Sequence, residues 1–190
     1  MKTKNLYIIS GPNGAGKTTA SVTILPEILE CREFVNADEI AKGLSPFNPE
    51  GMAIEAGRIM LQRINELLNG QDSFAIETTL STRSYTKLIE TAHKNGFSVR
   101  LLFFYLPSAQ HAIERVAQRV SEGGHNIPDD VIRRRYKAGL ENLFRIYIPL
   151  VDFWTLVDNN CNPRKIIADG EGAKMNIYEL TIFNTIKEHV

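Results

Sequence analysis

The chain has 190 residues, 43% hydrophobic and 23% charged, which suits a globular protein with a sizeable core. Its 22 basic and 22 acidic side chains balance, so no overall charge draws it to nucleic acid or to an anionic membrane. Its two cysteines lack the spacing of a zinc site or a disulfide framework, and no apolar run is long enough for a membrane span or a signal-peptide core, so we expect a cytoplasmic protein.

Short β-like runs alternate with helical patterns, which predicts an α/β fold and a single domain over residues 1–190. The expected strands are Asn5–Ser10, Glu33–Asn36, Ser73–Glu77, Phe97–Leu106 and Val151–Asp158, with a late strand at Lys165–Asp169. The expected helices are Gly16–Leu29, Pro49–Leu68, Ser84–Lys94, Ala109–Val120, Asp129–Tyr147 and Ile177–His189. This alternation favours a mainly parallel five-stranded sheet with flanking helices, in which the most hydrophobic strand, Phe97–Leu106, is central.

A glycine-rich segment between the first strand and the first helix satisfies the pattern G-x-x-x-x-G-K-[ST] of a phosphate-binding loop, or P-loop. Glycines let successive backbone N–H groups point at phosphate oxygens, and the start of the following helix favours an anion. The flanking strand and helix disfavour the alternative, a glycine-rich turn without this role. The predicted nucleotide-binding residues are Gly11, Pro12, Asn13, Gly14, Ala15, Gly16, Lys17, Thr18 and Thr19.

Two side chains of the P-loop carry chemistry of their own. Lys17 is expected to act on the β- and γ-phosphates of ATP or GTP, and the hydroxyl of Thr18 to bind Mg²⁺. The strand Phe97–Leu106 has no acidic residue at its end, where many P-loop ATPases keep an aspartate that supports the metal. Asp38 or Glu77 is therefore the expected supporting acid, and the lack of an L-S-G-G-Q-like segment argues against a transport ATPase.

Asp38 follows the second expected strand, and ligands of open parallel sheets bind beyond the carboxyl ends of the strands. A carboxylate there can face the γ-phosphate and accept the proton of a substrate hydroxyl. The alternative is that Asp38 caps a helix that begins near Glu39. We favour the catalytic role because of the position of Asp38 in the predicted site.

Glu77 ends the third expected strand, where a buried carboxylate needs a partner such as a metal-bound water, a substrate hydroxyl or Lys17. The alternative is a solvated strand end. Thr79 and Arg83 follow in the next loop and, with Glu77, form the predicted substrate-binding set.

The segment of about 108–147 reads as two helices around Gly123-Gly124, and five arginines flank that break: Arg115, Arg119 and Arg133–Arg135. Arginines near a flexible hinge suit a helical lid that closes over a nucleotide and neutralises charge on the transferred phosphoryl group. Exposed arginines on a solvated face are the alternative. The predicted catalytic arginines are Arg119 and Arg134.

Together these motifs make the sequence resemble the zeta-toxin-like branch of small P-loop kinases. The similarity rests on Gly11–Thr19, Asn36–Ile40, Ile76–Leu80 and the segment from Ile113 through Arg135, which occur in matching order. The resemblance implies a P-loop kinase core that uses ATP or GTP with Mg²⁺. It also implies that Asp38 is the general base, Glu77 a substrate-binding carboxylate and a lid arginine the transition-state stabiliser.

The phosphate acceptor remains open. Zeta toxins phosphorylate the sugar of UDP-N-acetylglucosamine, so the resemblance implies a nucleotide sugar as one acceptor and an antitoxin protein as a partner. We expect a small-molecule kinase whose acceptor pocket is formed by 43–48 and the following helix, with adenine near Asp158–Asn160. The alternative is an ATP-dependent switch or partner-binding ATPase, and a nucleic-acid kinase is a weaker option.

Overall fold

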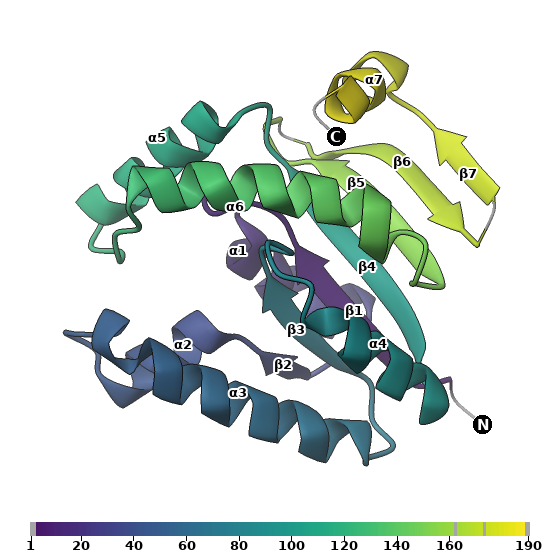
Figure 1. The fold of residues 1–190 in the computed structure, drawn as a ribbon, viewed down its shortest axis with the longest axis horizontal. Coiled ribbons are helices and arrows are strands. Elements are labelled where there is room, and N and C mark those ends of the chain that lie inside the picture. Colours follow the sequence, from purple (N-terminus) through teal and green to yellow (C-terminus); the bar gives the residue numbers. More distant parts are fainter. Residues whose placement is uncertain (1–2, 162, 173, 189–190) are drawn as a thin grey trace.

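The computed structural model describes residues 3–161, 163–172 and 174–188 and has an α/β fold around a seven-stranded sheet (Figure 1). The strands are β1 (Asn5–Ser10), β2 (Glu33–Val35), β3 (Phe74–Thr78), β4 (Ser98–Tyr105), β5 (Phe153–Asp158), β6 (Lys165–Glu171) and β7 (Lys174–Ile177). They are hydrogen-bonded in the order β2-β3-β1-β4-β5-β6-β7, so β4 is the middle strand, as its hydrophobic sequence predicts.

The sheet is mixed, which corrects the prediction of a mainly parallel five-stranded sheet. Strands β2, β3, β1, β4 and β5 pair in parallel, and β6 and β7 then extend the sheet in antiparallel pairing. Strand β6 runs back along β5 because the connection between them is too short for the crossover that parallel neighbours need. The sequence analysis did not predict strand β7, because all of its residues are exposed and it has no buried face. Its hydrogen bonds to β6 hold it in the sheet instead.

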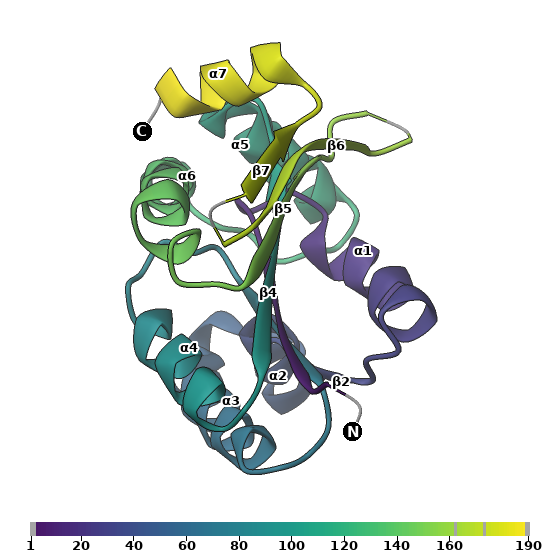
Figure 2. The same cartoon turned by 90° about the vertical axis from the view of Figure 1, so that its right-hand side faces the viewer.

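The helices are α1 (Lys17–Thr23), α2 (Ala37–Leu44), α3 (Ala53–Leu68), α4 (Tyr85–Lys94), α5 (Ala109–Ser121), α6 (Asp129–Asn142) and α7 (Leu180–Glu188). Figure 2 shows α1 on one side of the sheet and α3, α4 and α6 on the other. Within the described ranges, every helix is too short or too polar to cross a lipid bilayer.

Two buried clusters fill the space between the sheet and these helices. Leu6 and Ile8 of β1 belong to the cluster that includes side chains of α3, α4, α6 and α7. Tyr7 and Ile9, whose side chains point to the opposite face, belong to the cluster that includes side chains of α1 and α5. Strand β1 is therefore buried on both faces, and its carboxyl end, where the P-loop begins, is fixed by the core.

The helices end differently from the sequence prediction. Helix α1 gives way to a π-helical turn at Ile24–Ile28, because Pro26 lacks the N–H that an α-helix needs. Helix α6 likewise passes into a π-helical turn at Leu143–Tyr147. A short 3₁₀ turn precedes α3, and α7 begins only after β7, while the predicted helix end at His189 lies outside the described residues.

Candidate active site

The P-loop connects the end of β1 to the start of α1 in a conformation that requires glycine. Gly14 and Gly16 have φ angles of 76° and 71°, in the left-handed region that side chains disfavour. A Cβ atom on Gly16 would also lie only 2.8 Å from Nδ2 of Asn159. Gly16 is the second glycine that the P-loop pattern specifies. Its positive φ angle and the lack of room for a Cβ atom both explain why glycine is needed there.

The loop that follows β5 holds the P-loop from outside. Asn159 donates from Nδ2 to the carbonyl oxygen of Ala15 at 2.5 Å, and its backbone carbonyl oxygen accepts from Arg115 Nη2 at 3.1 Å. Arg164 Nε donates to Asn159 Oδ1 at 2.6 Å. The region predicted to lie near adenine, Asp158–Asn160, is thus directly beside the P-loop.

Lys17 lies at the centre of the site and is almost fully buried, with 6% of its surface exposed. Its Nζ donates to the carbonyl oxygen of Pro12 at 3.0 Å and lies 3.7 Å from Oε1 of Glu77. Burial lowers the pKa of Lys17, and the carboxylates of Glu77 and Asp38 oppose that shift. A phosphate group arriving here would meet an ammonium group that has little water around it.

Glu77, near the end of β3, is contacted by three side chains from two other segments. Its Oε2 accepts from Thr18 Oγ1 at 2.8 Å and from Asn36 Nδ2 at 2.9 Å, while Lys17 lies near Oε1. Burial raises the pKa of Glu77, and the charge of Lys17 and the hydrogen bond from Thr18 oppose that shift. Glu77 is therefore not a solvated strand end, which was the alternative from the sequence.

Asn36 is a residue of this cluster that the sequence analysis did not single out. It is 6% exposed, and its Oδ1 accepts from the backbone N–H groups of Asp38 and Glu39 at 2.9 and 3.4 Å. Asn36 is therefore the N-cap of α2, and the alternative role of Asp38 as that cap is wrong. The signal in the sequence was an asparagine at a strand end, two positions before the candidate base.

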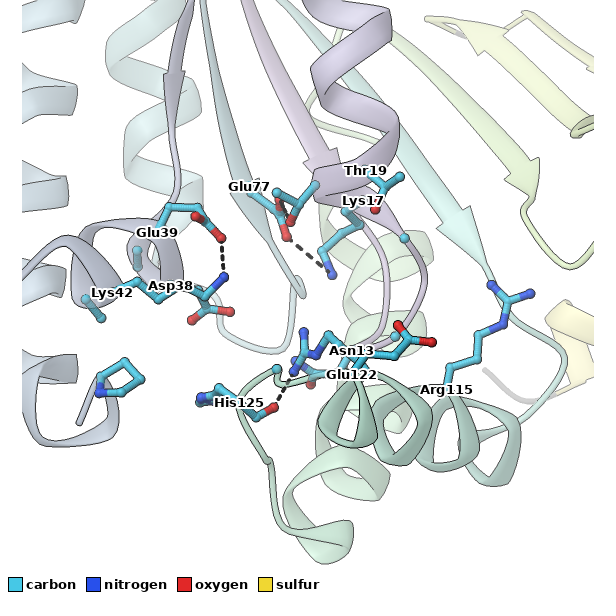
Figure 3. Close-up of a pocket in the computed structure, with 18 of the residues that line it drawn as sticks. Asn13, Lys17, Thr19, Asp38, Glu39, Lys42, Glu77, Arg115, Glu122 and His125 are labelled. Atoms are coloured by element: carbon cyan, nitrogen blue, oxygen red, sulfur yellow. Dashed lines mark hydrogen bonds and ion pairs between the residues drawn. The ribbon is translucent and has the colours of Figure 1, made fainter. Parts of the chain in front are cut away.

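One cavity, with a volume of about 1100 Å³, brings the predicted donor and acceptor residues together (Figure 3). Asp38 on α2 is exposed to this cavity, whereas Lys17 and Glu77 form its inner wall. Asn13 is 7% exposed, and its Oδ1 has no hydrogen-bond partner among the described residues. The remaining lining comes mainly from α1, α2, the start of α3 and α5, and includes Val22, Ala41, Lys42, Pro49, Glu50, Ala53, Arg115, Arg119, Glu122 and His125.

Arg119 is the predicted catalytic arginine that lines this cavity. It lies on α5, its Nη2 donates to the carbonyl oxygen of His125 at 2.8 Å, and its charge contributes to the lowered pKa of Lys17. Arg134, the other predicted catalytic arginine, is exposed on α6 and lies outside the cavity lining. Its neighbour Arg133 donates from Nη2 to Oε1 of Gln110 at 2.7 Å, and both side chains are exposed.

Thr79 and Arg83, predicted to bind substrate with Glu77, are not among the residues that line the cavity. Thr79 Oγ1 lies 2.9 Å from Ser81 Oγ, and Arg83 is exposed. Leu80 turns the loop away, since its φ angle is 55° and its side chain is fully buried. In this conformation the loop faces α6 rather than the cavity.

The residues present fit a magnesium ion. Thr18 Oγ1 and the carboxylate of Glu77 offer hard oxygen donors 2.8 Å apart beside the P-loop, which is the ligand chemistry that Mg²⁺ prefers. No group of three or more histidine, cysteine or acidic side chains that could by itself hold a metal occurs in the described part of the chain. A site here would therefore depend on phosphate oxygens and water as further ligands.

Comparison with known proteins decides the family. The family model described as zeta toxin matches residues 1–149. The chain belongs to the zeta toxin family. An uncharacterised protein of Haemophilus influenzae is 31% identical over 126 residues, which cover 66% of this chain and 88% of that protein.

Solved structures show that this family member has the fold of P-loop kinases. The AvrRxo1-ORF1:AvrRxo1-ORF2 structure with sulphate ions matches with a TM-score of 0.80 at 17% identity, covering 97% of this chain and 63% of that chain. The PezAT toxin–antitoxin system of Streptococcus pneumoniae matches with a TM-score of 0.70 at 15% identity, covering 100% and 86%. A gluconokinase of Sinorhizobium meliloti matches with a TM-score of 0.53 at 15% identity, covering 98% and 90%.

The family and the fold together support a kinase-type phosphotransferase in general. The chain spans less than two thirds, 63%, of the chain that it matches in the AvrRxo1-ORF1:AvrRxo1-ORF2 structure.

Proposed function

We propose that this protein transfers the γ-phosphate of ATP, or of GTP, to a hydroxyl group of a small molecule. The observation that carries the proposal is that Lys17 of the P-loop and Asp38 of α2 line the same cavity. Transfer between two bound molecules needs a nucleotide-binding residue on one wall and, on another, a carboxylate that is free to accept a proton. Asp38 has no side-chain hydrogen bond or ion pair with any other described residue.

Each side chain has a distinct part in the proposed reaction. Lys17 binds the phosphates, and the P-loop backbone orients them in line with the acceptor. Asp38 accepts the proton of the acceptor hydroxyl as its oxygen forms a bond to the γ-phosphorus. The bond between that phosphorus and the bridging oxygen of the β-phosphate breaks, so the products are ADP and the phosphorylated acceptor.

Thr18 and Glu77 would hold Mg²⁺ through the oxygen atoms described above. The ion, when bound, would neutralise charge on the phosphates. This assigns Glu77 to the metal side of the site, in preference to the substrate-binding role implied by the resemblance, because its carboxylate contacts Thr18 and Lys17.

Arg119 is the proposed stabiliser of charge on the transferred phosphoryl group, since its guanidinium group lines the cavity near Lys17. We further propose that the segment 108–147, which contains α5 and α6, acts as the lid. Its turn after α5 brings His125 to the cavity as well, and closure there would exclude water during transfer.

For the acceptor and the partner, the family supplies the leading candidates. A nucleotide sugar, as in zeta toxins, is the first acceptor to test, and an antitoxin protein is the first partner, because PezAT is a toxin–antitoxin system. Both would be encountered in the cytoplasm, where ATP is available.

The deciding experiment is incubation of the protein with a metabolite pool, ATP and Mg²⁺, followed by mass spectrometry to find the compound that gains a phosphate. The Asp38→Asn variant should lose on the order of 10²-fold or more in that transfer, because amide oxygen is a poor base, while ATP affinity stays near that of the wild type. An ATP-dependent switch would instead consume ATP with no phosphorylated product, and its hydrolysis would be indifferent to Asp38→Asn. Full transfer by the variant would show that Asp38 is not the base.

A further inference from the structure

One buried amide side chain connects the metal side of the site to the helix that carries the candidate base. Asn36 sits between β2 and α2, and both ends of its amide are occupied. Its Nδ2 donates to Glu77 Oε2 at 2.9 Å, and its Oδ1 accepts from the backbone N–H of Asp38 at 2.9 Å. No other described hydrogen bond joins Glu77 directly to α2.

The chemistry of the neighbours fixes the orientation of this amide. A carboxylate can only be a partner for the NH₂ end, and two backbone N–H groups can only be partners for the oxygen end. Glu77 Oε2 also accepts from Thr18 Oγ1, so the same carboxylate oxygen is held from two directions. A serine or threonine at position 36 would cap α2 equally well, but its shorter side chain would not reach Glu77.

We infer that Asn36 is a positioning residue: it holds the carboxylate of Glu77 beside Thr18 and fixes the start of α2, and with it Asp38, relative to the metal side of the site. The inference rests on the proposed function, because it matters only if Thr18 and Glu77 support a metal-bound nucleotide. It goes beyond that function because Asn36 is not among the residues that line the cavity and acts through Glu77 and α2. Partners that orient a metal-supporting carboxylate commonly change metal affinity by 10- to 100-fold when removed.

The test separates this positioning role from simple helix capping. The probe is Mn²⁺ with a non-hydrolysable ATP analogue, and its affinity for the full chain is measured by electron paramagnetic resonance. Asn36→Ser keeps a capping oxygen and loses the donor to Glu77, so we expect Mn²⁺ affinity to fall about tenfold while affinity for the metal-free nucleotide is unchanged. Asn36→Thr serves as a second capping variant in case the serine variant folds poorly.

Two further variants make the result specific. Asn95 at the end of α4 donates from Nδ2 to the carbonyl oxygen of Leu68, the last residue of α3, at 2.9 Å, and it is not among the residues that line the cavity. Asn95→Ala therefore removes a side-chain hydrogen bond at a helix end without touching the metal side and should leave Mn²⁺ affinity unchanged. In a Glu77→Gln background, Asn36→Ser should have little additional effect on Mn²⁺ affinity. The bond to Glu77 at 2.9 Å is the shorter of the two contacts that Asn36 Nδ2 makes on the metal side, the other being 3.5 Å to Thr18 Oγ1.

The outcomes are distinguishable from failure of the proposed function. If Asn36→Ser and Asn36→Thr bind Mn²⁺ and nucleotide as tightly as the wild type, the inference is overturned and Asn36 is only a cap. The same holds if Asn36→Ser and Glu77→Gln weaken Mn²⁺ binding additively. If the wild type itself fails to bind Mn²⁺ with the nucleotide, the proposed function is overturned, and this inference with it.

Discussion

At the scale of single residues, Arg119 differs from the arginines of α6 in where its side chain lies. It lines the cavity that contains Lys17, whereas Arg134 is exposed outside it. We therefore expect Arg119→Ala to lower the turnover of ATP with its acceptor on the order of 10²-fold, because one preorganised donor to the transferred group is lost. ATP affinity, measured by calorimetry, should fall much less, since the P-loop contacts remain.

Arg134→Ala is the matched control for that change. It removes the same charge from a helix of the same segment but should leave turnover within about twofold of the wild type, as is usual for exposed positions. A large loss in Arg134→Ala with little change in Arg119→Ala would show that α6 moves over the nucleotide and that the arginines exchange places on closure.

Tyr147 gives a prediction that depends on pH. Its hydroxyl donates to the carbonyl oxygen of Thr82 at 2.5 Å, and burial raises the pKa of Tyr147 to about 12. The unfolded chain has the ordinary tyrosine value of about 10, so the contribution of Tyr147 to stability is complete below pH 10 and is lost between pH 10 and 12. Urea unfolding of the wild type should therefore show stability falling over that range.

Tyr147→Phe isolates this contribution from that of the other tyrosines. Near neutral pH the variant should be less stable by about 1 kcal/mol, the net value of one hydrogen bond. The difference between the variant and the wild type should shrink as the pH rises from 10 to 12. In this range the unfolded wild type releases the Tyr147 proton while the folded protein retains it, a penalty that phenylalanine does not carry. A difference that stays constant over this range would contradict the role given to the Tyr147 hydroxyl.

At the scale of elements, α6 and the turn after it hold the loop that follows β3. Asn142 Nδ2 donates to the carbonyl oxygen of Leu80 at 2.8 Å, two residues before the carbonyl that Tyr147 binds. Gly139 completes the contact, because a Cβ atom there would lie 2.6 Å from the carbonyl oxygen of Thr79. The backbone of the loop after Glu77 thus packs directly against α6, the second helix of the proposed lid.

Because of this packing, we expect alanine substitutions at two helical glycines to have opposite effects on stability. Gly139→Ala should destabilise the protein by about 1–3 kcal/mol, because α6 or the loop has to shift to make room. Gly57, in α3, has no atom near its would-be Cβ, so Gly57→Ala should stabilise by about 0.5–1 kcal/mol through helix propensity. Urea unfolding of both variants checks the pair, and equal effects would contradict the close approach of α6 to Thr79.

The sequence predicted the parts of the site that depend on local motifs and on the ends of predicted strands. The P-loop pattern and the strand ends identified Lys17, Asp38 and Glu77, which the structure brings to one cavity. Which arginine faces that cavity depends on how α5 and α6 pack. The sequence alone therefore could not show that Arg119 lines the cavity and Arg134 does not. The loop after Glu77 is directed by a positive φ at Leu80, which no rule for leucine predicts.

At the scale of the whole molecule, the C-terminal part completes the core although it lies beyond the family match at residues 1–149. Strands β6 and β7 extend the sheet from β5, and α7 covers the cluster that also contains side chains of α6. Phe183 of α7 is 3% exposed and meets the ring of Phe144 edge to face, with ring centroids 6.0 Å apart. We therefore expect this part of the chain to contribute to stability, although none of its described residues lines the cavity.

The separation of stability from binding can be tested on one helix. Phe183→Ala removes a buried aromatic side chain and should lower the free energy of unfolding by about 3 kcal/mol or more, measured in urea. Leu180→Ala, at a position that is 60% exposed on the same helix, should change it by less than about 0.5 kcal/mol. Below the unfolding transition, both variants should bind ATP as tightly as the wild type, because α7 lies outside the cavity lining. A loss of ATP affinity in the folded Phe183→Ala protein would show instead that α7 positions the P-loop through β5 and the loop that carries Asn159.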